Sequence, residues 1–178
     1  MSPRPAPDLD LRRAQITQAA RDLAESEGWA AVTMRRVATE IGVTQPVLYS
    51  AFAGRQALID AVALNGFDAI AAALEAVAVS PAARMRAYLD FAAAHPTLYE
   101  AMFSMPSGLL FDAAAHEPLS RAFSAIHDAF PGPDDTRAEV AWATLHGLAT
   151  LQASGRLPER RLQARLDYAH HMLTRDQD

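Results

Sequence analysis

The chain lacks cysteine and lysine, and only 7% of its 178 residues are aromatic. Without cysteine, disulfide frameworks, thiol catalysis and cysteine-based zinc sites are excluded. All sixteen basic side chains are arginine, which indicates no mechanism by itself. Alternating β-branched runs are also missing, whereas alanine is abundant and proline and glycine separate segments of helical length. The composition therefore predicts an all-α protein.

Targeting and membrane segments are not apparent in the sequence either. Residues 1–8, MSPRPAPD, lack the apolar core of a signal peptide, and we predict that they form a disordered N-terminal arm. We expect no uninterrupted apolar segment long enough to span a bilayer. The sequence thus predicts a cytoplasmic protein with no membrane partner.

The motifs of common enzymes are missing as well. No His-Glu-x-x-His string, phosphate-binding Walker loop or Gly-x-Gly-x-x-Gly stretch occurs, and the adjacent His170 and His171 would diverge around a helix. We therefore expect no catalytic residue, no metal site and no cofactor. An α-helical enzyme without these motifs remains an alternative.

What the sequence does contain is a series of segments with helical periodicity. Ser80 before Pro81 predicts a helix start, and Thr97 to Glu100 and Thr136 to Glu139 have the Thr-x-x-Glu form of a capping box. Besides two short helices within 32–57, the predicted helices cover residues 9–27, 55–79, 81–94, 97–103, 119–130, 136–153 and 158–174.

The two short helices meet at Gly42. Apolar residues before it fall at i, i+3, i+4 and i+7, and Thr33 is placed to cap that helix. Thr44 is placed to cap the second helix, and Pro46 suits its first turn because the missing N–H would have no partner there. The inward positions are Met34, Val37, Ala38, Ile41, Leu48, Ala51 and Phe52, which leaves Gln45, Val47, Tyr49 and Ser50 outward.

This arrangement predicts a DNA-binding helix-turn-helix, and its residues resemble a known family. GVTQPVLYSAFAGRQAL at 42–58 is similar to the signature of the tetracycline-repressor (TetR) family, as is TMRRVA at 33–38. Two departures are Ala51, where the family most often has histidine, and Arg55, where it usually has lysine. The resemblance implies a three-helix DNA-binding domain at 9–55 and a larger helical bundle for ligand binding and dimerisation at 56–178.

The second half resembles the WHG-type ligand-binding domain of the same family. The resemblance rests on AHPTLYEAMF at 94–103 and AWATLHGLATL at 141–151, with Trp142, His146 and Gly147. It implies a pocket for a small-molecule effector of unknown identity. Large or polar residues that could line it, most of which we expect to be core, are Phe91, His95, Tyr99, Met102, Phe103, Phe111, Phe123, Trp142 and His146.

Contacts with double-stranded DNA are expected from seven residues. Arg35 would grip a phosphate or pair with guanine, Gln45 would pair with adenine, and Tyr49 and Arg55 would hold phosphates. Arg12, Arg13 and Arg36 are expected to be ordinary surface charges. The DNA-binding set is Thr33, Arg35, Thr44, Gln45, Pro46, Tyr49 and Arg55.

Charge is compatible with specific rather than broad DNA binding. The net charge is -5, yet residues 9–56 carry six arginines and five carboxylates.

A homodimer would double the contacts and place half-site centres of a pseudo-palindromic operator about 10 base pairs apart or modestly more. Its expected interface is a four-helix contact through Leu145, Leu148, Leu151, Leu162, Leu166, Tyr168 and Leu173. The near-neutral motif keeps open a second alternative, a protein-interaction module with the helix-turn-helix as scaffold.

Overall fold

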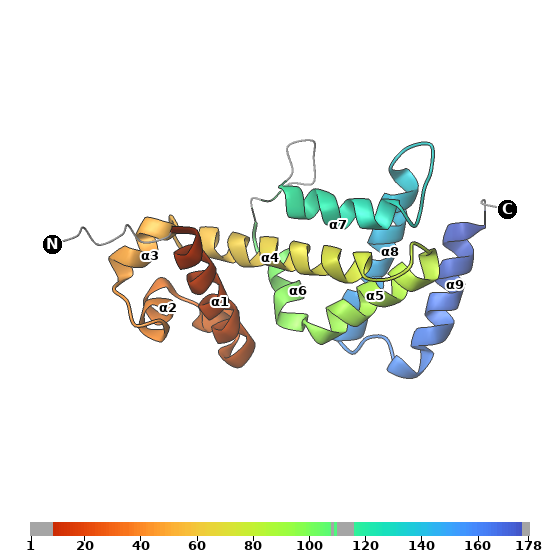
Figure 1. The fold of residues 1–178 in the computed structure, drawn as a ribbon. Helices are drawn as coiled ribbons and strands as arrows, with labels where there is room; N and C mark the ends of the chain where they lie inside the picture. The colour runs from red at the N-terminus through yellow and green to blue at the C-terminus, as the bar shows by residue number, and fades with distance from the viewer. Residues whose placement is uncertain (1–8, 108, 110–115, 176–178) are drawn as a thin grey trace. The chain divides into compact units, whose positions relative to one another are not determined.

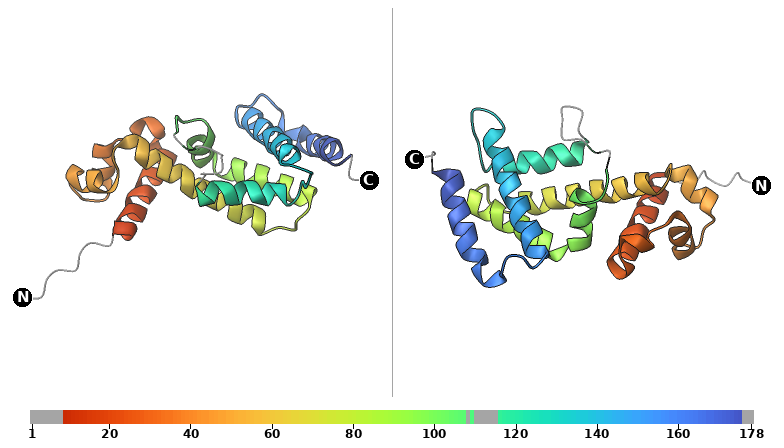
Figure 2. Two further views of the ribbon diagram at one scale, coloured as in Figure 1. Left: turned by 90° about the horizontal axis from the view of Figure 1, so that it is seen from above. Right: turned by 180° about the vertical axis from the view of Figure 1, so that it is seen from behind.

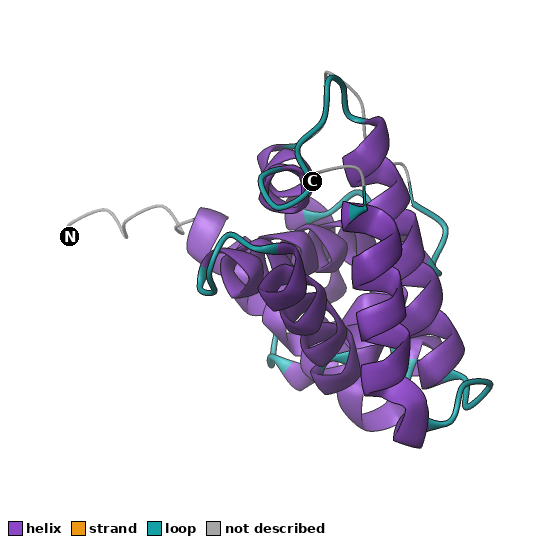
Figure 3. Ribbon diagram, turned by 90° about the vertical axis from the view of Figure 1, so that its right-hand side faces the viewer, coloured by secondary structure: helices purple, strands orange, loops and turns teal. Residues whose placement is uncertain are grey.

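A computed structural model describes residues 9–107, 109 and 116–175. The predicted arm at 1–8 and the candidate Phe111 lie outside the described residues. The described part contains helices and connecting loops and no strand (Figure 3). The helices are α1 (Leu9–Glu27), η1 (Trp29–Ala31), α2 (Met34–Glu40), α3 (Gln45–Ala51), α4 (Arg55–Glu75), α5 (Pro81–Ala94), α6 (Pro96–Phe103), α7 (Glu117–His127), α8 (Thr136–Ala153), η2 (Glu159–Arg161) and α9 (Leu162–Thr174).

The chain forms two compact units (Figure 1). The first combines Met1–Gly66 with Thr97–Leu109, and the second combines Phe67–Pro96 with Leu110–Asp178. The division falls inside α4, beyond residue 55, where the sequence predicted the end of the DNA-binding domain. The first unit also takes in most of α6, which the sequence assigned to the larger domain.

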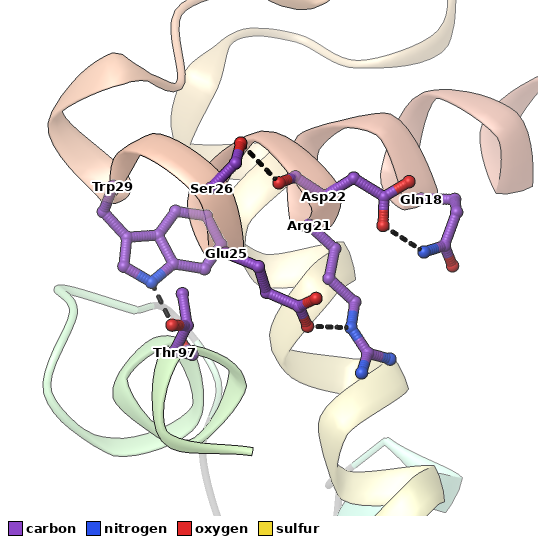
Figure 4. A network of polar contacts seen from close by, with 7 residues as sticks. All are labelled: Gln18, Arg21, Asp22, Glu25, Ser26, Trp29 and Thr97. Atoms are coloured by element: carbon purple, nitrogen blue, oxygen red, sulfur yellow. Dashed lines mark hydrogen bonds and ion pairs between the residues drawn. The ribbon is translucent and has the colours of Figure 1, made fainter. Parts of the chain in front are cut away.

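The first unit is built around the inner faces of α1, α2 and α3, which contact one another. Its core includes the side chains of Ile16, Leu23, Val37, Leu48, Phe52 and Leu58, none more than 3% exposed. Trp29 is buried beside them, and its indole Nε1 donates to the carbonyl oxygen of Thr97 at 3.0 Å (Figure 4). This bond fixes the start of α6 to the first unit across 68 residues of sequence.

The outer face of α1 carries polar pairs one helical turn apart. Arg21 Nε donates to Glu25 at 2.8 Å and Gln18 donates to Asp22 at 2.7 Å (Figure 4). Pairs of this spacing on an exposed helix contribute only a few tenths of a kcal/mol each, about 0.2–0.5. The first unit therefore depends on its apolar core for stability.

In the second unit, α5 packs against both α8 and α9, and α7 packs against α8 (Figure 2). Alanines on the inner face of α8, such as Ala138, Ala141 and Ala149, are buried and have little side-chain volume to hold neighbouring helices apart. On the surface, Arg121 of α7 is paired with Asp68 and with both carboxylate oxygens of Glu75 in α4.

Proline residues place two helix starts earlier than predicted. The helix expected at Thr97 begins at Pro96, and that expected at Leu119 begins at Glu117, with Pro118 in its first turn. Proline fits there because the first N–H groups of a helix have no intrahelical partner. The capping box predicted at Thr136 is also not formed, because Asp135 is the N-cap and a carboxylate oxygen of Asp134 accepts from Thr136 N.

Helix α4 is the most apolar long helix that the structure describes, although Asp60 and Asp68 interrupt its apolar sequence. It is long and apolar enough to cross a membrane by length and composition, and half of the relevant window is buried within the protein. Core helices of soluble proteins meet the same criterion. Its buried residues, including Leu58, Val62, Phe67, Ile70 and Leu74, belong to the cores of the two units.

Candidate DNA-binding and effector sites

The turn between α2 and α3 has the geometry that the sequence predicted. Thr33 Oγ1 accepts a hydrogen bond from the backbone N–H of Arg36 at 3.1 Å, which confirms Thr33 as the N-cap of α2. At the other end, Gly42 has a φ of +67°, and the N–H of Val43 donates to the carbonyl of Ala38 at 2.9 Å. This is a Schellman motif, in which a positive φ after the last helical turn reverses the chain.

Helix α3 presents one buried and one exposed face. Leu48 and Ala51 are buried, and Phe52 after them is 2% exposed. The exposed face carries Gln45, Pro46 and Tyr49, and the Tyr49 side chain is 54% exposed. A large aromatic side chain left on the surface beside an amide is available to a DNA groove.

Thr44 occupies the N-cap position of α3 but makes no side-chain capping hydrogen bond. Its extended backbone, with φ −84° and ψ 152°, is that of an N-cap residue. The predicted position is therefore confirmed and the predicted capping bond is not. The exposed Thr44 hydroxyl retains its capacity to contact a phosphate.

Arg35 and Thr33 lie on the exposed side of α2. Among the described residues, the Arg35 guanidinium has no recorded ion pair or hydrogen bond, in contrast to its neighbour Arg36. Arg36 pairs with Glu27 of α1 at 2.5 Å, and this ion pair raises the pKa of Arg36. The two adjacent arginines therefore have different environments: Arg36 is paired within the protein, whereas Arg35 is exposed and available to an external anion.

Arg55 has a different environment from the one its predicted phosphate contact requires. Its Nε donates to the carbonyl of Val32 at 2.6 Å and its Nη2 to the carbonyl of Trp29 at 2.7 Å. The guanidinium therefore ties the first turn of α4 to the segment that precedes α2. A phosphate contact could use only the donors that these bonds leave.

Arg13, expected to be an ordinary surface charge, also has a structural role. Its guanidinium carbon lies 4.2 Å from the centre of the Phe52 ring, and Nη1 donates to the carbonyl of Ala51. The cation–π contact and the hydrogen bond hold α1 against the C-terminal end of α3. Neither contact is evident from sequence spacing, because the partners lie 38 residues apart.

The residues predicted to bind an effector fall into both units. Tyr99, Met102 and Phe103 belong to the first unit, where the Tyr99 and Phe103 rings lie 4.7 Å apart. Met102 is buried against Gly66 of α4 so closely that a Cβ on Gly66 would lie 2.6 Å from the Met102 sulfur. These three residues pack within the first unit.

The other five predicted residues belong to the second unit. Trp142 Nε1 donates to the Tyr88 hydroxyl at 3.2 Å, and the Phe123 ring meets Trp142 edge-on at 6.1 Å. The rings of Phe91 on α5 and of His95, the C-cap residue of that helix, lie 5.0 Å apart. The structure thus places α5, α7 and α8 around an aromatic cluster of Tyr88, Phe123 and Trp142.

His146 lies one helical turn after Trp142 on α8. Partial burial lowers the pKa of its imidazole below the ordinary value. A neutral imidazole offers one donor and one acceptor rather than two charged donors. Trp142 and His146 thus contribute neutral polar groups to the second unit.

The sequence interpretation missed Arg84 and Tyr88 of α5. Tyr88 is 2% exposed and Arg84 is 3% exposed. The Nε and Nη1 atoms of Arg84 are buried and have no hydrogen-bond partner in the described structure. A signal was available, because Arg84 and Tyr88 share one helical face at i and i+4, and an arginine in line with core residues is unusual.

The predicted dimer residues differ in exposure. Leu145 and Leu166 are buried in the core of their own chain, so they are not available to a partner. Tyr168 is 69% exposed and Leu151 is 41% exposed. An apolar groove of about 690 Å³ between α8 and α9 is lined by Val140, Thr144, Leu148, Arg161, Ala164, Arg165, Tyr168, Ala169, Met172 and Leu173.

A second cavity, of about 550 Å³, lies where the ends of α5 and α8 meet the loop before α9. Its lining includes Leu89, Ala92, Gln152, Leu157 and Glu159, and none of the predicted effector residues. Across the residues that the structure describes, no three His, Asp or Glu side chains are grouped so that they could hold a metal ion.

Two family models match the chain. Residues 16–62 match the model described as bacterial regulatory proteins, tetR family, and residues 82–175 match the model described as tetracyclin repressor-like, C-terminal domain. The first match contains α2, α3 and the turn between them. The second runs from the second residue of α5 through α6, α7, α8 and α9.

Individual proteins show the same similarity. An uncharacterised HTH-type transcriptional regulator of Mycobacterium tuberculosis is 28% identical over 158 residues, which cover 82% of this chain and 72% of the relative. A protein with unknown function from Rhodococcus sp. RHA1 is 28% identical with a TM-score of 0.69, covering 99% of this chain and 98% of that one. BioQ of Mycobacterium smegmatis shares the fold at 23% identity, with a TM-score of 0.61 and coverage of 92% and 96%.

Proposed function

Because the chain belongs to the TetR family of bacterial transcriptional regulators, we propose that it is a cytoplasmic homodimeric repressor that a small-molecule effector releases from DNA. The observation that carries this proposal is the exposed face of α2 and α3. Arg35, Gln45 and Tyr49 face outward there, while the opposite faces of both helices are buried. A helix held in this way can enter a major groove and read base edges.

The proposed contacts are of two kinds: some position the protein on the DNA backbone, and one reads the base sequence. Arg35, Thr33, Thr44 and Tyr49 contact phosphates, which orient the protein without specifying sequence. Gln45 at the start of α3, beside Pro46, contacts a base edge, and an amide suits adenine because it both donates and accepts.

Release by an effector requires two conformations with different affinities. In the proposed mechanism, the effector binds the second unit more tightly when α4 has moved the recognition helices away from groove spacing. DNA then weakens effector binding by the same factor by which the effector weakens DNA binding. Helix α4 is suited to this coupling because it runs through both units.

A reporter experiment tests repression. A duplex selected by the purified protein is placed between a promoter and a fluorescent reporter in a heterologous bacterium. We expect wild type to lower fluorescence and Gln45→Ala to lower it less. Increased fluorescence would identify an activator instead, and unchanged fluorescence with both proteins would contradict regulation through this site.

The interaction-module alternative makes a different prediction. A chain that kept the helix-turn-helix only as scaffold would not enrich any duplex, even at low salt, where phosphate contacts are strongest. The near-neutral charge of residues 9–56 is the observation that favours this alternative.

A further inference from the structure

Arg84 is a charged side chain in the interior of the second unit. It is 3% exposed and shares the inner face of α5 with Tyr88, one turn along, and Phe91, two turns along. Arginine keeps its proton in proteins, so its charge remains even when it is buried. Buried charges are normally paired, because an unpaired one loses its hydration without compensation.

The described structure does not supply that pairing. Nε and Nη1 of Arg84 are buried without a hydrogen-bond partner. Glu75 is close enough for the charge of Arg84 to contribute to lowering its pKa. Both Glu75 carboxylate oxygens, however, accept hydrogen bonds from Arg121, at 2.8 and 2.7 Å. The acidic group near Arg84 is therefore already held by another arginine.

The surroundings of Arg84 along α5 are aromatic. The next turn carries Tyr88, whose hydroxyl accepts from Trp142, and Phe123 lies edge-on to Trp142. We propose that Arg84 binds the carboxylate of a small organic acid whose apolar body packs toward Tyr88 and Trp142. This inference rests on the proposed function, since it makes that acid the effector.

Charge matching favours a carboxylate over a phosphate. One guanidinium balances one negative charge, and an arginine–carboxylate pair has two matching hydrogen bonds. A phosphate monoester carries up to two charges at neutral pH and commonly recruits several donors. His146, whose pKa is lowered by burial, adds no second cation to this cluster.

The test uses the full chain and two acids with neutral matches. Benzoate and hexanoate are titrated into the protein by calorimetry and in thermal unfolding, beside benzamide and hexanamide. We expect the acids to bind and to raise Tm and the amides to do neither. Arg84→Met, which keeps an unbranched side chain as far as the position of Nε but lacks the charged guanidinium group, should weaken binding of the acids roughly 10- to 100-fold, the loss typical of a charge-assisted hydrogen bond.

Arg86→Met is the matched control, because it removes an arginine of the same helix that is not buried and already donates to Gln163. It should leave acid binding unchanged. Equal acid binding by wild type and Arg84→Met would overturn the proposal, as would equal binding of acids and amides. No Arg84-dependent effect with either acid, or the same stabilisation by inorganic phosphate or chloride, would also overturn it.

A DNA competition assay separates this inference from the proposed function. Fluorescence anisotropy of a selected duplex is measured with each acid present. Acids that bind through Arg84 and leave DNA affinity unchanged would contradict effector release while the carboxylate site stands. Normal DNA binding together with Arg84-independent acid binding would overturn the carboxylate site and leave the regulator intact.

Discussion

At the scale of single residues, Arg55 shows how strongly an arginine's role depends on its neighbours. Sequence position at the start of α4 suggested a phosphate contact. In the folded chain, its guanidinium bonds to carbonyls 23 and 26 residues earlier. Those partners come from tertiary packing, so the pattern around Arg55 could not predict them. The same holds for Arg13, which contacts Phe52 and Ala51.

The bonds of Arg55 predict a loss of stability on substitution. Arg55→Ala removes two hydrogen bonds from a charged donor, and Arg55→Lys keeps the charge but lacks the planar fork. We expect either change to lower the free energy of unfolding by about 2–3 kcal/mol in urea denaturation. Arg35→Ala, at an exposed position, should change it by less than about 0.5 kcal/mol. Wild-type stability in Arg55→Lys would contradict the structural role.

For DNA binding, we expect the exposed Arg35 to matter more than Arg55, which is the reverse of their effects on stability. Arg35→Ala is expected to weaken binding to all duplexes alike and to reduce the slope of log K against log salt by about 1, because one phosphate contact is lost. Anisotropy titrations over a range of salt measure both effects. An unchanged slope would show that Arg35 does not contact a phosphate, so that it either reads a base or makes no contact with DNA.

His146 predicts a pH dependence of stability. Burial lowers its pKa in the folded chain from the ordinary value of 6.5. As pH falls below 6.5, the unfolded chain therefore takes up a proton that the folded chain takes up only at lower pH, and the free energy of unfolding decreases. His146→Gln should lose less stability than wild type between pH 7 and pH 5 in matched denaturation curves. Parallel curves for the two proteins would contradict this.

At the scale of elements, the predictions that held are those carried by local backbone chemistry. Helix α1 ends where Gly28 adopts a φ of +82°, and α5 begins after Ser80, whose hydroxyl accepts from Ala83 N. The predicted starts of α6 and α7 differ from the structure because each helix has a proline in its first turn, and the sequence interpretation placed that proline outside the helix. The sequence could not predict that Nε and Nη1 of Arg84 lack a hydrogen-bond partner in the described structure, because this follows from the ion pair between Arg121 of α7 and Glu75.

Capping gives a matched pair of substitutions. Thr33 accepts a backbone hydrogen bond and Thr44 does not, although both occupy N-cap positions. Thr33→Ala should lower the free energy of unfolding by about 1 kcal/mol and Thr44→Ala by clearly less. Equal losses in chemical denaturation would show that the hydroxyl bond of Thr33 is not what stabilises α2.

At the scale of the whole molecule, the proposed dimer depends on the exposed apolar residues of α8 and α9. Tyr168→Glu places a charge beside the apolar groove and should raise the dimer Kd by roughly 100-fold or more. Val79→Glu is the control, because Val79 is 63% exposed and lies outside α8 and α9. Sedimentation of both variants measures the effect. A dimeric Tyr168→Glu protein would place the interface elsewhere.

The central claim is specific DNA recognition through α3, and selection of duplexes from a random pool by the purified protein tests it most directly. The account predicts enrichment of a pseudo-palindrome with half-site centres about 10 base pairs apart or modestly more, and loss of preference at one base position per half-site with Gln45→Ala. No enrichment of any duplex at low salt would contradict it.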